Sequence, residues 1–120
     1  MGIKMTSVSF DDAWLRGQLA DIPKKWHAHI RRVFRNGIMQ ELCPLNGRQS
    51  FYGKANVFTY FEDGFLISYT TIVSVMKNGV VTRLGKWTNT TSVHQRTYER
   101  RFGHVTVRQA SQGYARSCRE

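Results

Sequence analysis

The sequence is poor in the residues that build disulfide frameworks, metal sites and membrane spans. Its two cysteines, Cys43 and Cys118, are too few for a disulfide framework and lack the spacing of a metal site. The longest apolar runs, such as residues 65–67 and 72–73, are far below the ~20 residues that a membrane span needs. Polar and charged residues also interrupt the N-terminal segment where a secretory signal would carry its apolar region. These absences predict a cytoplasmic protein with no membrane contact, no metal and no cofactor.

Carboxylates are scarce as well. The chain has 8 Asp and Glu residues against 18 Lys and Arg residues, a formal net charge of +10. Several acids, such as Asp11, Asp12 and Asp63, stand where a helix or turn is expected to start, which disfavours a two-carboxylate catalyst or a Mg²⁺-dependent nuclease. His27 and His29 would point to different sides of a helix, and the sequence contains no P-loop, dinucleotide-binding glycine pattern or nucleophile elbow. We therefore expect a protein that is not an enzyme.

The chain has enough apolar residues to fold. Hydrophobic residues make up 41% of it, which supports one domain over residues 1–120 that buries about 65% of its unfolded surface. We expect a basic helical extension at residues 1–37, a sheet-and-helix core at 50–102 and a flexible tail at 110–120. A folded domain with this excess of positive charge is most simply explained by a polyanionic partner, usually nucleic acid.

Two helices are predicted in the first third of the chain. Ser9 is suited to cap a helix over residues 10–20, and Asp21 to cap a second one, with Pro23 in its first turn. Gly37, after an asparagine, would end the second helix with a positive φ. The second helix carries five cations and no acid: Lys24, Lys25, Arg31, Arg32 and Arg35. Like charges gathered in this way favour a surface that contacts phosphates, the alternative being a solvated helix face.

A three-stranded antiparallel meander is predicted next, after a loop over residues 38–49. The expected strands are residues 51–61, 65–77 and 80–87, which are rich in aromatic and β-branched residues. A three-residue turn ending at Gly64 would pair Phe61 with Phe65. The Asn78-Gly79 dipeptide is the strongest hairpin signal in the chain and would pair Lys77 with Val80.

This register divides the sheet into two faces. The core face would carry Val57, Phe61, Phe65, Ile67, Tyr69, Val73, Val75 and Leu84. The opposite face would carry Lys54, Asn56, Phe58, Tyr60, Ser68, Thr70, Ser74, Arg83 and Trp87. Aromatic rings mixed with cations on the second face are typical of a platform for single-stranded nucleic acid. Alternatively, the first helices cover this face and its aromatic residues belong to the core.

In the last third of the chain, the sequence pattern predicts one helix over residues 92–102 that ends at Gly103. A short strand is expected after it, within residues 104–109. The threonine-rich segment 88–92 opens this helix, so its free backbone N–H groups would suit an anion. Lys86, Arg96 and Arg100 would add positive charge near that anion. In the alternative, Thr90 or Ser92 only caps the helix, and His94 packs under the sheet beside Tyr98. The order of elements predicts an α+β domain whose C-terminal helix packs on one sheet face.

Three separated segments carry a resemblance. Residues 50–55 read SFYGKA, residues 68–73 read SYTTIV and residues 87–94 read WTNTTSVH. Together, in this order, they resemble a family of small uncharacterised domains with the patterns SFYGKA, SY-x-T-x-V and W-S-x-TTS-x-H, although Thr88 stands where serine is usual. The resemblance implies an origin in a bacteriophage, plasmid or other mobile element and a place in the bacterial cytoplasm. It implies no particular activity.

We predict a non-enzymatic protein that binds nucleic acid, DNA or RNA, or a nucleoprotein complex, through a surface rich in Lys and Arg. The expected binding residues are Lys24, Lys25, Arg31, Arg32, Arg35, Lys54, Phe58, Tyr60, Arg83, Lys86, Trp87, Thr90, Thr91, Arg96 and Arg100. The alternative is a phage-encoded inhibitor of a host defence or nucleic-acid-processing enzyme, similar to anti-CRISPR proteins, that acts by protein–protein binding. An unrecognised enzyme is the remaining alternative.

Overall fold

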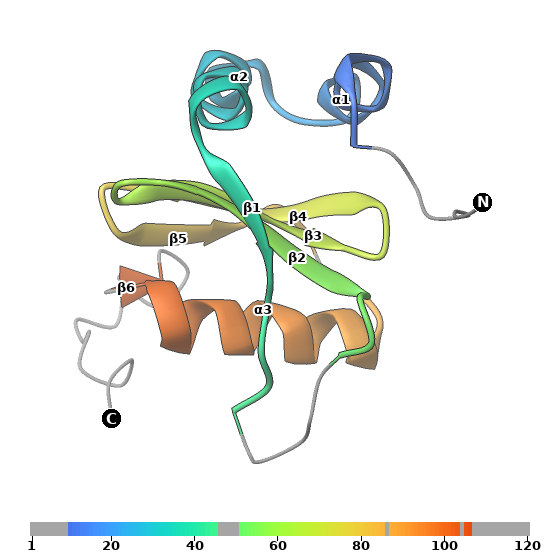
Figure 1. The fold of residues 1–120 in the computed structure, drawn as a ribbon, viewed down its shortest axis with the longest axis vertical. Coiled ribbons are helices and arrows are strands. Elements are labelled where there is room, and N and C mark those ends of the chain that lie inside the picture. The colour runs from blue at the N-terminus through green and yellow to red at the C-terminus, as the bar shows by residue number, and fades with distance from the viewer. Residues whose placement is uncertain (1–9, 46–50, 86, 104, 107–120) are drawn as a thin grey trace.

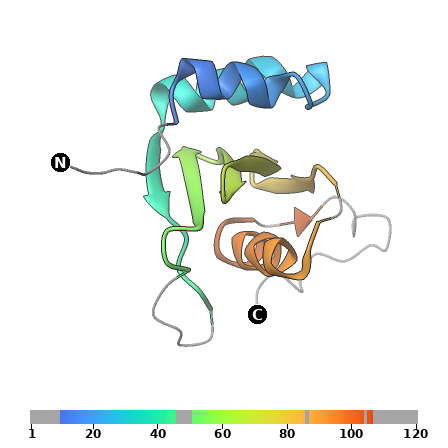
Figure 2. The same ribbon diagram turned by 90° about the vertical axis from the view of Figure 1, so that its right-hand side faces the viewer.

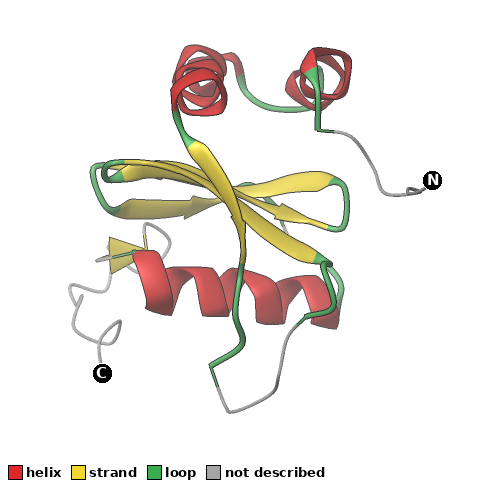
Figure 3. Cartoon of the chain, in the orientation of Figure 1, coloured by secondary structure: helices red, strands yellow, loops and turns green. Residues whose placement is uncertain are grey.

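The computed structural model describes residues 10–45, 51–85, 87–103 and 105–106. Within these ranges the chain forms three α-helices, one short 3-10 helix and six strands (Figures 1 and 3). The helices are α1 (Asp12–Leu19), η2 (Lys24–Trp26), α2 (His27–Asn36) and α3 (Asn89–Phe102). The strands are β1 (Ile38–Glu41), β2 (Ala55–Tyr60), β3 (Asp63–Ser68), β4 (Thr71–Lys77), β5 (Val80–Arg83) and β6 (Val105–Thr106).

The described elements form three layers. The strands make one sheet in the order β1-β2-β3-β4-β5-β6, in which β1 to β5 are antiparallel neighbours and β6 pairs parallel to β5. Helices α1 and α2 cover one face of the sheet and α3 covers the other (Figures 1 and 2). The α+β class is therefore confirmed, and so is the packing of the C-terminal helix on one face. The number of strands is larger than the predicted three-stranded meander, because β1 lies in the expected loop 38–49 and the predicted strand 65–77 forms two strands, while β6 lies within the short strand expected at 104–109.

Both faces of the sheet are buried. Beneath α1 and α2, Phe58, Phe65, Ile67 and Val75 pack with apolar residues of both helices. Beneath α3, a second cluster joins sheet residues to Tyr98 of the helix, and the sheet residues in it include Ala55, Val57, Leu66, Val73, Met76 and Val81. Every residue of β3 is buried, as is typical of a strand covered on both faces.

The β2–β3 hairpin differs from the predicted one. It closes on two residues, Phe61-Glu62, with Tyr60 paired to Asp63 and Phe58 to Phe65, so the predicted pairing of Phe61 with Phe65 is wrong. Phe61 is 87% exposed instead of lying in the core. It adopts a left-handed conformation with φ 57°, which glycine or asparagine usually supplies in such turns.

The predicted strand 65–77 is in fact two strands. β3 and β4 meet at a turn of Tyr69 and Thr70, where Ser68 pairs with Thr71 and Tyr69 has φ 60°. An aromatic residue in the left-handed region gives no turn signal in a sequence. The Asn78-Gly79 turn is confirmed, because Lys77 pairs with Val80. The shifted hairpins also divide the predicted core face, since Val57 and Val73 lie under α3 while Phe65 and Val75 lie under α1 and α2.

The helix ends also differ from expectation in detail. Asp11 caps α1 by accepting a hydrogen bond from the Trp14 N–H at 2.9 Å, whereas the predicted cap, Ser9, lies outside the described residues. Pro23 precedes η2 directly, and no side chain caps α2. Gly37 ends α2 with φ −92° and is required for another reason, because a Cβ there would lie 2.4 Å from the Thr59 carbonyl oxygen.

Candidate nucleic-acid interface and the pocket beside α3

The cations of η2 and α2 lie on the solvent side of their layer. Lys24, Lys25, Arg31 and Arg35 are exposed, while Ile30 and Val33 of the same helix are buried against the sheet. The ion pairs Arg32–Asp63 and Arg83–Glu99 involve none of these four cations. We call them the α2 cations. Their charge is therefore available to a partner.

Arg32 differs from its neighbours because it holds α2 to the sheet. Its guanidinium donates to the Asp63 carboxylate at 2.5 Å and lies 5.7 Å from the ring centroid of Tyr60. Burial raises the pKa of Asp63, but the hydrogen bonds from the Asn78 backbone N–H and the Arg32 guanidinium lower it by more. The pKa of Asp63 therefore lies below its usual value. This predicted binding residue serves the fold.

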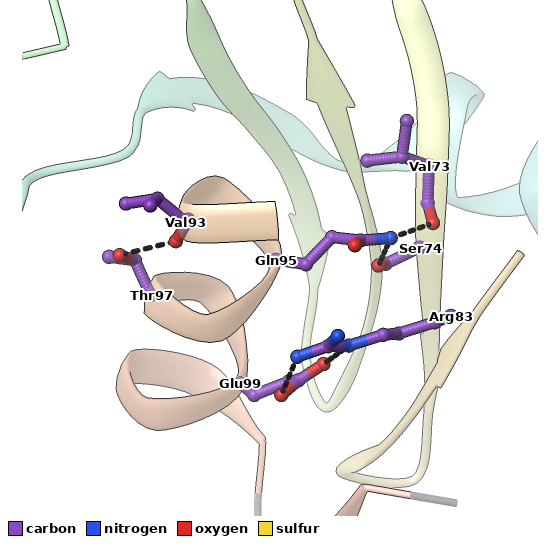
Figure 4. Close-up of polar contacts among 7 residues, drawn as sticks. All are labelled: Val73, Ser74, Arg83, Val93, Gln95, Thr97 and Glu99. Carbon is purple, nitrogen blue, oxygen red and sulfur yellow. Dashed lines mark hydrogen bonds and ion pairs between the residues drawn. The ribbon is translucent and has the colours of Figure 1, made fainter. Parts of the chain in front are cut away.

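The predicted aromatic platform is divided. Phe58 is 8% exposed, its ring lies 5.3 Å from that of Phe34 on α2, and Tyr60 packs against the same cluster. Arg83 instead faces α3, where it forms an ion pair with Glu99 through contacts of 2.5 and 3.0 Å (Figure 4), and Trp87 is 42% exposed. The alternative weighed for this face, that the first helices cover it, therefore holds for Phe58 and Tyr60 but not for Arg83 or Trp87. The reason is that two helices precede the sheet and have nowhere else to bury their apolar sides.

The two predicted sets of cations lie in opposite layers. Arg96 and Arg100 are exposed on α3, on the far side of the sheet from α2 (Figure 1). Lys86 lies outside the described residues, and Trp87 is exposed just before α3. The structure thus does not bring all the predicted cations to one surface.

A pocket of about 270 Å³ lies beside the start of α3. It is lined by Phe51, Tyr52, Lys54, Tyr69, Thr90, Val93 and His94. These residues come from all three segments on which the sequence resemblance rests. Tyr52 precedes Gly53 in a tight turn and, like Tyr69, has a positive φ. We call this cavity the α3 pocket.

Polar contacts with the sheet hold α3 against this pocket. The side chain of Gln95, the residue after His94, donates to the Val73 carbonyl at 2.9 Å. Arg83 binds Glu99, which lies one turn further along α3 than Gln95 (Figure 4). Arg101 donates to the carbonyls of Cys43 and Pro44 and so ties the segment after β1 to the helix. The position of the pocket wall is therefore fixed by buried polar groups that have partners.

His94 forms the floor of the pocket and is 1% exposed. Its Nδ1 lies 2.8 Å from the Ser68 hydroxyl, which in turn lies 2.9 Å from the Thr91 hydroxyl. This contact holds the ring in one orientation. Burial, with the nearby charge of Lys54, lowers the pKa of His94 below 6.5, which favours the neutral ring. The pocket floor is therefore an oriented imidazole.

The first turn of α3 also borders the pocket. The cap is Thr88, whose hydroxyl accepts from the Thr91 N–H at 3.4 Å, and Thr90 lies between them on the pocket wall. Backbone N–H groups at this position have no intrahelical acceptor. Lys54 adds a positive charge at the mouth, with its Nζ 6.0 Å from the ring centroid of Tyr69.

Sequence reasoning found part of this pocket. Lys54 and Thr90 are predicted binding residues that do line it, while Thr91 supports its floor through Ser68. The sequence analysis missed Tyr52 and Tyr69 as pocket residues. Its alternative for His94, burial under the sheet, agrees with the 1% exposure of this residue and its contact with Ser68, and the ring also lies 4.6 Å from that of Phe51. The three motif segments of the sequence resemblance meet at this pocket, and this was the signal that could have predicted it. The segments meet only because the chain turns tightly at Tyr69, and the sequence analysis did not predict that turn.

Two searches of the described residues bear on other classes of site. No group of three or more His, Cys, Asp or Glu side chains in these ranges is placed to hold a metal ion. No helix in the described part of the chain is long and apolar enough to cross a membrane.

Comparison with known proteins places the chain in a family. No curated protein and no solved structure matches it. A protein-family model matches residues 40–113, more than half of the 120 residues, and this range contains β2 to β5, α3 and the α3 pocket but not α2. The chain therefore belongs to a family of unknown function (DUF8033).

Proposed function

We propose that this protein binds nucleic acid through the α2 cations and is not an enzyme. The observation that carries the proposal is the exposure of four cations on one short stretch of residues 24–35 that contains no acidic residue. Such charges contact phosphates and release the counterions condensed on a nucleic acid. Because the interface is a helical surface without a described aromatic platform, the expected binding is independent of sequence.

The test is a titration of labelled DNA and RNA, single- and double-stranded, over a range of salt concentrations. Affinity is expected to fall steeply with salt, by roughly 0.9 in the log–log slope for each phosphate contact on a duplex. Two matched variants locate the surface, since R31Q/R35Q and R96Q/R100Q remove the same charge from opposite layers. The proposal predicts a larger loss for R31Q/R35Q. Equal losses, or no complex at low salt, would contradict it.

A protein partner is the second candidate. Strand β1 forms one edge of the sheet, and all four of its residues are exposed, including Ile38 and Met39. An exposed edge strand with apolar side chains is suited to pairing with a strand of another protein. In this second proposal the protein inhibits a nucleic-acid-processing enzyme by binding to it. Its origin in a mobile element and its location in a bacterial cytoplasm are predictions that the resemblance implies.

Capture from a bacterial lysate separates the two candidates. A partner that survives nuclease treatment and is lost in M39K supports pairing at β1. Partners that disappear with nuclease treatment support direct binding of nucleic acid.

A further inference from the structure

We propose that the α3 pocket binds a single nucleotide, with its phosphate near Lys54 and the first turn of α3 and its base against Tyr69. The pocket lies on the opposite side of the sheet from the α2 cations, so it is a separate site. That the pocket binds an anion is argued independently of the proposed function. That the anion is a nucleotide, and not another flat phosphorylated compound, rests on the proposed function.

The first argument is that a cation and exposed aromatic surface meet at the mouth. Lys54 is exposed and lies over the ring of Tyr69 at 6.0 Å from its centroid. Tyr69 is 46% exposed, so a flat ligand can reach its ring. Base–aromatic stacking combined with a nearby cation is how proteins hold the bases of single-stranded nucleic acid without reading its sequence, and the same contacts suit one nucleotide.

The pocket wall and floor are polar as well. Thr90 stands in the first turn of α3, where backbone N–H groups lack an intrahelical acceptor and suit a phosphate oxygen. Independently of this helix start, His94 lines the same cavity, with its Nδ1 2.8 Å from the Ser68 hydroxyl.

The third argument is size. A cavity of about 270 Å³ falls just below the ~300–1,000 Å³ of pockets that enclose drug-sized ligands. It therefore suits a ligand no larger than about one nucleotide. An adjoining hollow of about 300 Å³ shares Phe51 and Val93 with it and is lined by Arg96 and Arg100. These two cations could receive the next phosphate of a strand, so the nucleotide is either free or the end of a strand.

The experiment measures binding of AMP, adenosine, inorganic phosphate and short oligoadenylates with and without a 5′-phosphate, by calorimetry and by NMR of the His94 ring. AMP is expected to bind and to shift the His94 signals, while adenosine and phosphate alone bind at least tenfold more weakly. Tighter binding of the phosphorylated oligonucleotide than of AMP identifies a strand end, and equal binding identifies a free nucleotide. Absence of AMP binding at millimolar concentration overturns the inference.

The variants are chosen so that the fold survives. Tyr69→Asn removes the ring and places a residue that tolerates positive φ in the turn. Phe61→Asn makes the same change in the neighbouring hairpin, outside the pocket, and is its control. Loss of a stacked base, worth about 1–3 kcal/mol, predicts a roughly 5- to 150-fold weaker AMP affinity for Tyr69→Asn alone. Equal AMP affinity in the two variants contradicts the inference.

Lys54→Gln tests the phosphate contact, with Lys77→Gln as a control of equal charge. It is expected to weaken AMP but not adenosine. The proposed function is tested separately, because R31Q/R35Q should retain AMP binding while it loses affinity for duplex. AMP binding without duplex binding would support the nucleotide pocket and contradict the proposed function. Duplex binding without AMP binding would contradict the nucleotide pocket alone.

Discussion

The α2 cations and the α3 pocket carry positive charge in two contrasting settings. The α2 cations lie on the outside of an exposed helical layer, whereas the pocket combines one exposed lysine with a buried neutral histidine and aromatic walls. In the two proposals, the first arrangement would contact a charged backbone of any sequence and the second would fit the shape of one ligand. The family match begins at residue 40, so the pocket lies within it and α2 does not. The proposals therefore assign the ligand to the matched region and the electrostatic affinity to the α2 cations outside it.

The largest expected effect follows from removing the α2 cations together. The variant K24Q/K25Q/R31Q/R35Q should lower the magnitude of the log–log salt slope on a duplex by up to about 3.6, or about 0.9 for each lost phosphate contact. All four side chains are exposed, so the thermal midpoint should change little. Fluorescence anisotropy over a salt series measures the slope. An unchanged slope would show that the α2 cations do not contact the phosphates.

The next largest expected effect is the loss of stability when one of the two ion pairs that hold a helical layer to the sheet is broken. The Arg83 and Glu99 side chains are 17% and 8% exposed, whereas Arg32 is 48% exposed. Arg83→Met leaves the Glu99 carboxylate buried without its charged partner and should cost about 3 kcal/mol of unfolding free energy. Arg32→Met should cost about 1 kcal/mol, because that pair is screened and Asp63 keeps its bond from Asn78. Urea unfolding of both variants checks the order, and the reverse order would contradict it.

The same contrast explains what the sequence could and could not predict. The amphipathic pattern of α2, the Asn78-Gly79 hairpin and the helix ended by Gly103 depend on local chemistry, and the structure confirms all three. The pocket depends on two turns whose left-handed residues, Tyr52 and Tyr69, are aromatic. Propensity places such residues within strands, so the predicted register carried Tyr69 into the core. The burial of Phe58 likewise depended on which helices cover which face, and no local pattern contains that information.

A smaller effect is expected from the support of the pocket floor. Ser68→Ala removes the hydroxyl that lies between His94 and Thr91 and leaves two buried polar groups short of a partner. The expected cost is about 1–2 kcal/mol of unfolding free energy, with a lower AMP affinity because the ring loses its orientation. Ser74→Ala is the control, since this buried serine contacts Gln95 only at 3.4 Å. Equal AMP affinity in both variants would show that Ser68 supports the fold alone.

The smallest expected effect is a pH dependence of stability that arises in the α3 pocket and not at the α2 cations. The groups around His94 are Phe51, Ser68, Tyr69 and Thr91, together with the cation Lys54. Burial, then the charge of Lys54, lowers the pKa of His94 below 6.5, so the unfolded chain takes up this proton first as the pH falls. Stability is therefore complete above about pH 6.5 and declines as the pH falls from there to the folded pKa.

His94→Gln should abolish this decline, which thermal unfolding at a series of pH values measures. Asp63 does not interfere, because its pKa lies below 3.8 and its contribution is lost only in that lower window. AMP should raise the pKa of His94 in the wild-type chain, because a phosphate favours the charged ring. The α2 cations keep their charge between pH 6 and 8, so their own contribution to duplex affinity should stay constant in that range. A pH-dependent duplex affinity that disappears in His94→Gln would show instead that both regions belong to one site.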